Sequence, residues 1–413
     1  MSPLIAAFVL AAPAIHTDCA CSYGFYMPEI AVTALAHAQE QDQSQKQPDP
    51  NTPQTKDEKR HQDDLANDVK IGKEAAAEID KELKPSENQD QVARVKAIGA
   101  EMAEIANAST VNVMWGDPRH NTFQYEFKLV KGEDVNAFSL PGGIIYVYEG
   151  LVDFTESDDE LAGVLAHEIS HASFRHLDAL RREQAKVDIA QIPLLIAAAL
   201  AGNSNPDAMK ALIAVQLVGA GLSSGWSVKA ETAADYGGLQ YMMKSRYSPV
   251  GCLTFMERLG YEERVAPQID WGIYRTHPPT PERARFMIRS MNEFGIAVKR
   301  SLTTTSFSAR SIPKDDGSFE LWFGNYLIAT YRGADAKDRG AASVLRLNAF
   351  LDTVPQMYQL GSNGDEIQGN GRTLVTLKPA DLKEGESISA NRDAAMATLK
   401  KVIADLQYRL WRG

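Results

Sequence analysis

Three of the eight histidines in this sequence fall at positions 167, 171 and 176, and two of them frame a glutamate. The segment 165–171 reads Leu-Ala-His-Glu-Ile-Ser-His, so His167 and His171 are four residues apart and Glu168 directly follows the first. On a helix, residues i and i+4 share a face, so both imidazoles can reach one metal ion. Glu168 can then act as general base on a metal-bound water. The pattern predicts a hydrolytic site with one Zn2+ per chain.

A hydrolytic zinc site needs a third protein ligand and an open position for water. Glu231, in the segment Glu-Thr-Ala-Ala-Asp at 231–235, is the best candidate for this ligand. Asp235 lies one helical turn further on the same face and could accept the outer ring N–H of a ligating histidine, which would fix its tautomer. The alternative is a pair of solvated helix acids, since most Asp and Glu side chains lie at protein surfaces.

Two further segments complete a set of four ordered motifs. They read Asn-Ala-Phe-Ser-Leu-Pro-Gly-Gly at 136–143 and Thr-His-Pro-Pro-Thr at 276–280. Together the four motifs resemble those of the HtpX-like, CAAX-endopeptidase-like zinc metallopeptidases, a gluzincin family, over roughly residues 65–291. The resemblance implies that His167, His171 and Glu231 are zinc ligands, that Glu168 is the catalytic base, and that Asp235 supports a ligand from behind.

Within this family the chain resembles the exported branch that includes BepA and LoiP. It lacks the long hydrophobic spans of the integral-membrane branch and the tetratricopeptide tail of BepA. The resemblance implies an endopeptidase of the cell envelope or periplasm that cleaves misfolded or misassembled polypeptides. The rival hypothesis is a latent or non-proteolytic zinc-containing chaperone or assembly factor, although the complete set of Glu168 and three ligands argues against this as the only function.

The sequence leaves the roles of His277 and Arg283 open. His277 could approach the metal and either block its open position or stabilise the oxyanion of the transition state; otherwise it is a loop histidine held by the two prolines after it. Arg283 could pair with an acid that orders this loop, bind substrate, or be a helix-surface cation. His176, five residues after His171, is expected to point off the ligand face and to have a structural role.

Residues 136–140 are best interpreted as an exposed edge strand, with Asn136 and Phe138 as candidate substrate-binding residues. An extended peptide can add to such an edge as a further strand, and its backbone pairing tolerates many sequences. Gly142 and Gly143 permit a close approach of the backbone or an unusual turn. The alternative is a plain hairpin turn.

Composition and the N-terminal segment indicate the compartment. The 413 residues are 44% hydrophobic, which excludes a polytopic membrane protein, and the net charge of −11 argues against nucleic acid as a partner. Residues 5–15 are apolar and Ala-His-Ala at 36–38 fits a cleavage site, so residues 1–38 are predicted to be a signal peptide, although no Lys or Arg precedes Lys46. The alternative is a retained anchor. The polar residues 39–64 predict a disordered linker.

Hydrophobic periodicity and the resemblance together predict an α+β fold. Residues 65–298 are expected to form a mainly helical, zincin-like metalloprotease domain with a small edge-strand sheet, in which residues 158–182 are one helix. The apolar segments 189–201 and 211–222 are too short to span a membrane and could form a buried hairpin, a lid or a peripheral membrane contact. Residues 299–413 are expected to form a small C-terminal α+β domain of unknown role, with a strand at 343–351 and a Gly-rich loop at 361–371.

Overall fold

The computed structural model describes residues 55–184, 225–266, 277 and 280–410. The described residues from Arg60 onward form one compact unit. The predicted signal peptide, the linker as far as residue 54, both apolar segments, and residues 276, 278 and 279 lie outside the described part of the chain. None of the helices described is both long and apolar enough to cross a membrane.

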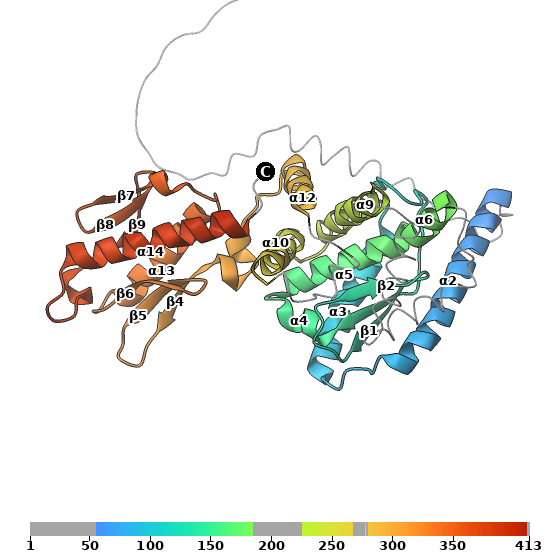
Figure 1. The fold of residues 1–413 in the computed structure, drawn as a ribbon, viewed down its shortest axis with the longest axis horizontal. Coiled ribbons are helices and arrows are strands. Elements are labelled where there is room, and N and C mark those ends of the chain that lie inside the picture. Colours follow the sequence, from blue (N-terminus) through green and yellow to red (C-terminus); the bar gives the residue numbers. More distant parts are fainter. Residues whose placement is uncertain (1–54, 185–224, 267–276, 278–279, 411–413) are drawn as a thin grey trace, which may run out of the picture. The chain divides into compact units, whose positions relative to one another are not determined.

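Helices and small sheets alternate along the chain, in agreement with the α+β prediction (Figure 1). The elements before residue 299 are α2 (Lys56–Glu82), α3 (Gln89–Ala108), β1 (Glu126–Val130), β2 (Ala137–Ser139), β3 (Ile144–Tyr148), α4 (Glu149–Phe154), α5 (Asp158–Ser173), α6 (His176–Gln184), α9 (Gly225–Met242), α10 (Val250–Val265) and α12 (Pro281–Glu293).

The first sheet has the order β1-β3-β2, with β1 parallel and β2 antiparallel to β3. Side chains alternate between the two faces of a strand, so β3 contributes to two cores. Ile144 and Tyr146 pack with Ile79 of α2, whereas Ile145 and Val147 pack into the core that α3 and α5 share. The sheet therefore lies between α2 and the helix that carries the two histidines.

The predicted linker is wrong for residues 56–64, because α2 begins at Lys56. This end of the helix has no apolar stripe, but its polar side chains have tertiary partners. His61 Nε2 lies 2.7 Å from Asn121 Oδ1, and Asp64 pairs with Arg119 at 3.2 Å. Hydrophobic periodicity alone predicts that the helix starts at Leu65. Polar contacts with a loop distant in sequence extend it to Lys56.

The prediction of one continuous helix over 158–182 is wrong, because α5 ends at Ser173 and a separate helix, α6, starts at His176. Arg175 has a φ of 52°, in the left-handed region that a continuing helix cannot contain. The chain therefore turns sharply four residues after the second histidine of the motif.

A second set of elements follows residue 299 and surrounds its own apolar core, which runs from Phe307 to Leu410. These elements are η3 (Arg300–Leu302), η4 (Thr305–Phe307), β4 (Ala309–Pro313), β5 (Phe319–Phe323), β6 (Tyr326–Tyr331), α13 (Ala336–Leu351), η5 (Met357–Gln359), β7 (Leu360–Asn363), β8 (Glu366–Gly369), β9 (Arg372–Thr376), η6 (Pro379–Asp381) and α14 (Ile388–Arg409). Two antiparallel three-stranded sheets, β4-β5-β6 and β7-β8-β9, are formed there.

Two expectations for this region are wrong. The strand predicted at 343–351 is part of helix α13, whose buried residues Ser343, Leu347 and Phe350 recur at helical rather than alternating spacing. The Gly-rich segment predicted as a loop contains the hairpin of β7 and β8, and Gly364 with a φ of 59° supplies its turn.

Candidate metal centre

Helix α5 is held rigidly along most of its length. Ser157 caps its N-terminus by accepting a hydrogen bond from the Glu160 backbone N–H, and Leu161, Leu165 and Ile169 are fully buried. Helix α9 packs along it, and two glycines of α9 permit the close approach. A Cβ at Gly237 would lie 2.4 Å from the Phe174 ring, and one at Gly238 would lie 3.2 Å from the backbone nitrogen of His167. This packing brings α9 carboxylates to the histidines of α5.

His167, His171 and Glu231 direct their polar atoms at one point. The two histidine Nε2 atoms are 3.1 Å apart, and each lies 3.3 Å from an oxygen of Glu231. Ligands at the corners of a tetrahedron, each about 2.0 Å from a metal, would be about 3.3 Å apart. The observed spacing therefore fits a small tetrahedral metal ion.

His277 supplies a fourth donor to the same group. It is 8% exposed, and its Nδ1 lies 3.3 Å from His167 Nε2 and 3.1 Å from both oxygens of Glu231. One ligand atom from each of the four residues lies within 4.8 Å of the others. Of the alternatives that the sequence leaves open, the structure supports a position of His277 beside the three predicted metal ligands.

Asp235 and Arg283 lie directly behind the ligands. Asp235 Oδ1 is 3.0 Å from His167 Nδ1, so the outer nitrogen of that ring donates to a carboxylate while Nε2 faces the group. Arg283 is 4% exposed and donates two hydrogen bonds of 2.7 Å to Asp235, and its Nη1 lies 3.0 Å from Glu231. It pairs with buried acids and is not a surface cation.

The charges of this cluster reinforce one another. Burial would raise the pKa of Glu231, but the charges of His277 and Arg283 hold it well below its usual range. Burial would lower the pKa of His167, yet its contacts with Asp235 and Glu231 raise it to about 10. Even beside Arg283, the two buried carboxylates attract a proton onto His167, and a divalent metal ion could supply this positive charge instead.

His176 contacts His171, a predicted ligand, contrary to the expectation that it points away. Its Nδ1 is 3.0 Å from His171 Nδ1, and its Nε2 is 3.0 Å from the Trp115 carbonyl oxygen. A carbonyl only accepts, so His176 Nε2 carries the proton and His176 Nδ1 accepts from His171. His171 Nε2 is then left with its lone pair toward the metal group. The break after α5 turns His176 back, and periodicity alone could not reveal it.

Glu168 lies beside the metal group. It is 1% exposed, its Oε1 is 3.3 Å from His277 Nε2, and neither oxygen makes a hydrogen bond with the described residues. Buried polar groups are usually paired, and the exceptions cluster at functional sites. Its carboxylate is therefore available to a water or a substrate.

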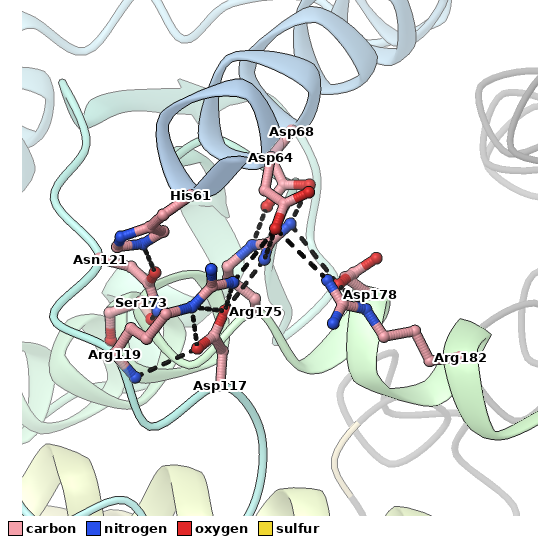
Figure 2. A network of polar contacts seen from close by, with 10 residues as sticks. All are labelled: His61, Asp64, Asp68, Asp117, Arg119, Asn121, Ser173, Arg175, Asp178 and Arg182. Atoms are coloured by element: carbon pink, nitrogen blue, oxygen red, sulfur yellow. Dashed lines mark hydrogen bonds and ion pairs between the residues drawn. The ribbon is translucent and has the colours of Figure 1, made fainter. Parts of the chain in front are cut away.

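A buried ion cluster fixes the C-terminal end of α5 (Figure 2). Arg175 donates to Asp68 of α2 at 2.5 and 3.1 Å and to Asp117 at 3.0 Å. The Asp117 backbone N–H and the Asn121 amide donate to the last carbonyls of the helix, those of Phe174 and Ser173, at 2.7 Å each. These carbonyls have no partner within the helix, so the cluster both caps α5 and attaches it to α2.

The predicted edge segment is at the sheet edge, but its side chains are not exposed. Asn136, Ala137 and Phe138 are all buried, and Phe138 stacks on Tyr146 at 5.0 Å in the core beneath α2. The structure therefore does not bring Asn136 or Phe138 into the metal group. Gly142 and Gly143 have φ values of 80° and 94°, and a Cβ at Gly142 would lie 2.5 Å from Val69 of α2. The turn therefore requires glycine both for its backbone conformation and for its close approach to α2.

Two histidines from one helix, a carboxylate from a second and a glutamate beside them define a helix-borne site of the metallopeptidase class. Residues 90–290, the peptidase-family region, match the family described as Peptidase family M48.

Curated relatives agree with this assignment. The beta-barrel assembly-enhancing protease of Yersinia pestis is 30% identical over 176 residues, which cover 42% of this chain and 34% of that protein. The mitochondrial metalloendopeptidase OMA1 of Schizosaccharomyces pombe is 31% identical over 162 residues, covering 39% of this chain and 45% of that protein. The metalloprotease LoiP of Escherichia coli is 28% identical over 217 residues, covering 51% and 79%. The chain spans less than half the length of the first two relatives.

Proposed function

We propose that the chain is a zinc-dependent endopeptidase in which His167, His171 and Glu231 hold the metal and Glu168 is the general base. The observation that carries this proposal is the spacing of 3.1 to 3.3 Å among the three ligands, with Glu168 directly beside them. Two imidazoles and a carboxylate are a donor set typical of catalytic zinc. A bound zinc ion would acidify a water and polarise the scissile carbonyl.

The chain's own residues would move the proton and hold the geometry. Glu168 would take a proton from the attacking water and deliver it to the leaving nitrogen. Asp235 and His176 would each accept the outer N–H of one ligand histidine and so keep both Nε2 atoms directed at the metal. Arg283 would neutralise the buried charge of Asp235 and Glu231.

The backbone edge of β2 supports a polypeptide substrate. Among the described strands, β3 alone pairs with β2. The Asn136 carbonyl accepts a hydrogen bond from the Tyr148 N–H, and the Leu140 N–H donates one to the Ile144 carbonyl, so Ala137 and Ser139 between them direct their N–H and C=O groups away from β3. Ala137 is fully buried, but Ser139 is partly exposed, and an extended peptide could pair at Ser139 whatever its side chains. Misfolded or misassembled envelope polypeptides are the substrates we propose, on the resemblance to the exported branch and the similarity to a protease named for β-barrel assembly.

A second candidate function rests on His277. Its Nδ1 lies at ligand distance from the metal group and would occupy a fourth corner, whereas a catalytic zinc site keeps one position open. This arrangement favours a latent enzyme or a zinc-containing assembly factor. The variant His277→Ala separates the latent enzyme from the assembly factor. Cleavage by this variant but not by the parent would indicate a latent enzyme. A variant that binds zinc but still cleaves nothing would favour the assembly factor.

The main test compares the zinc content and casein cleavage of the chain with those of Glu168→Gln. The substitution keeps the size of the side chain but removes the base, so we expect unchanged zinc and cleavage at least about 100-fold slower. Glu104→Gln, an exposed glutamate on α3, is the matched control and should match the parent. Undiminished cleavage in pure Glu168→Gln would contradict the role of Glu168, and a folded protein that binds no zinc would contradict the site.

A further inference from the structure

One aspartate attaches the loop of residues 115–117 to the turn after α5 (Figure 2). The backbone N–H of Asp117 donates a 2.7 Å hydrogen bond to the Phe174 carbonyl oxygen. Its carboxylate accepts one of 3.0 Å from Arg175 and another of 2.8 Å from Arg119. The Asp117 and Arg175 side chains are only 11% and 2% exposed, so solvent screens their ion pair little. The loop and the turn are therefore held as one unit.

The neighbours of this ion pair make the hydrogen bond that orients a predicted metal ligand. Trp115 lies two positions before Asp117, and His176 directly follows Arg175. The Trp115 carbonyl accepts from the His176 ring at 3.0 Å, and the other nitrogen of that ring lies 3.0 Å from His171 Nδ1. A proton on His171 Nδ1 leaves the lone pair of its Nε2 for a metal. The orientation of His171 therefore depends on where the loop holds the Trp115 carbonyl.

Gly116 shows how closely the loop fits against this hydrogen-bonded ring. Its φ of 112° lies in the region that favours glycine. A Cβ at Gly116 would lie 2.4 Å from the Phe174 carbonyl oxygen and 2.9 Å from Cδ2 of the His176 ring. Even a methyl group in the middle of the loop would therefore press on the ring that contacts His171.

We propose that Asp117 is a positioning residue of the metal site, which keeps the His171 Nε2 lone pair directed at the metal. It acts through the hydrogen bond between Trp115 and His176, and the proposal rests on the proposed zinc peptidase. Asp117 is not one of the four donors of the metal group. Loss of its carboxylate would let the Trp115 carbonyl move away from the ring. His176 could then carry its proton on the nitrogen that faces His171, which could no longer donate to it.

The first test reads the tautomer of His176 in the metal-free chain, by NMR of 15N-labelled histidine side chains. In the parent we expect the proton on Nε2 alone, and in Asp117→Ala a second population with the proton on Nδ1. Asp178→Ala is the matched control and should keep the parent's tautomer. Asp178 is 12% exposed and also faces Arg175, at 3.5 Å, but it lies on α6 and not in the loop. A parent with the proton on Nδ1, or an unchanged tautomer in Asp117→Ala, would overturn the proposal.

The second test measures zinc affinity by competition with a chelator. Asp117→Ala should weaken zinc binding about tenfold, the lower end of the usual cost of disturbing a partner behind a ligand, and Asp178→Ala under about twofold. A residue that acts through another has no effect once that other residue is replaced. In the His176→Phe background, Asp117→Ala should therefore change the affinity by less than about twofold. If Asp117→Ala does not fold, Asp117→Asn, which removes the charge but keeps the size, replaces it in both tests.

The outcomes separate this role from the proposed function. A parent that binds zinc no more tightly than Asp117→Ala would contradict the positioning role alone. A tenfold loss both with and without His176→Phe would mean that Asp117 only stabilises the fold around the site, and would overturn the proposal. A folded parent that binds no zinc would contradict the zinc peptidase and, with it, any role of Asp117 at a metal.

Discussion

The outer nitrogens of the ligand histidines decide which ring nitrogen faces the metal group. Asp235 performs this task for His167, and the sequence pattern already indicated it. His176 performs it for His171, with the Trp115 carbonyl fixing its own proton. Burial lowers the pKa of both His171 and His176, so both rings favour the neutral form that this chain of hydrogen bonds requires.

We therefore expect His176→Phe to weaken zinc binding about 10- to 100-fold, the usual cost of losing a partner behind a ligand. The new ring keeps the contacts with the Trp115 and Phe174 rings, which lie 5.2 and 5.6 Å from the His176 ring, so the fold should persist. The measurement is competition with a chelator of known affinity. His120→Phe, at an exposed position, is the control. Equal zinc affinity in parent and His176→Phe would show that His176 only fills space.

At the scale of elements, the active helix depends on α2 through Arg175. Arg175 is 5% exposed, and its guanidinium faces Asp68 and Asp117. Burial raises the pKa of Asp68, and the contact with Arg175 does not fully offset this. Burial would also raise the pKa of Asp117, but hydrogen bonds from Arg119 and Arg175 hold it well below its usual range. The cluster thus pairs carboxylates that could not remain charged in the interior alone.

Arg175→Met should lower the free energy of unfolding by about 3 kcal/mol or more, because it leaves buried carboxylates without their cation. Met tolerates the positive φ as poorly as Arg, so the backbone strain is matched. Arg182→Met is the control: its ion pair with Asp178 is short at 2.7 Å, but its side chain is 52% exposed, and its loss should cost under about 1 kcal/mol. Urea unfolding measures both. Equal losses in the two variants would refute a special role of Arg175.

Local periodicity explains which features could be predicted from the sequence. The spacing of His167 and His171 on one helix depends on five consecutive residues, and α5 does contain both. The positions of His277 and Arg283 depend on how the chain after α10 returns to α9, which no local pattern encodes. The early start of α2 likewise depends on ion pairs with residues more than 50 positions away. The turn at Arg175 depends on aspartates from two other segments.

At the scale of the molecule, two acids connect the peptidase-family region to the chain that follows it, the buried Glu257 and the partly exposed Glu156. Glu257 of α10 pairs with Arg300 through two contacts of 2.7 Å. Glu156, just before α5, accepts hydrogen bonds from Thr304, Thr305 and Ser306, including one of 2.7 Å from the Ser306 backbone N–H. The start of the second core is therefore attached to the base of the helix that carries the metal ligands.

This attachment should make stability depend on acidity. Burial would raise the pKa of Glu156, but hydrogen bonds from Ser306 and Thr304 outweigh it and lower the pKa from 4.5 to about 2. A carboxylate with a lowered pKa in the folded state stabilises fully above its unfolded pKa, and this stabilisation disappears as the pH falls through the folded value. Glu156→Gln should therefore cost about 2 kcal/mol at pH 7, less than half of that at pH 3, and almost nothing near pH 2.

The measurement is urea unfolding of the parent and Glu156→Gln across this range, because the difference between them cancels the titration of all other groups. Glu384→Gln, at an exposed position in the chain after residue 299, should show no such difference at any pH. A cost for Glu156→Gln that stayed constant from pH 7 to pH 3 would mean that the hydrogen bonds are equally good with an amide and that charge has no part in them. A cost that shrank as expected would show that the charged carboxylate itself holds the chain after residue 299 to the peptidase-family region.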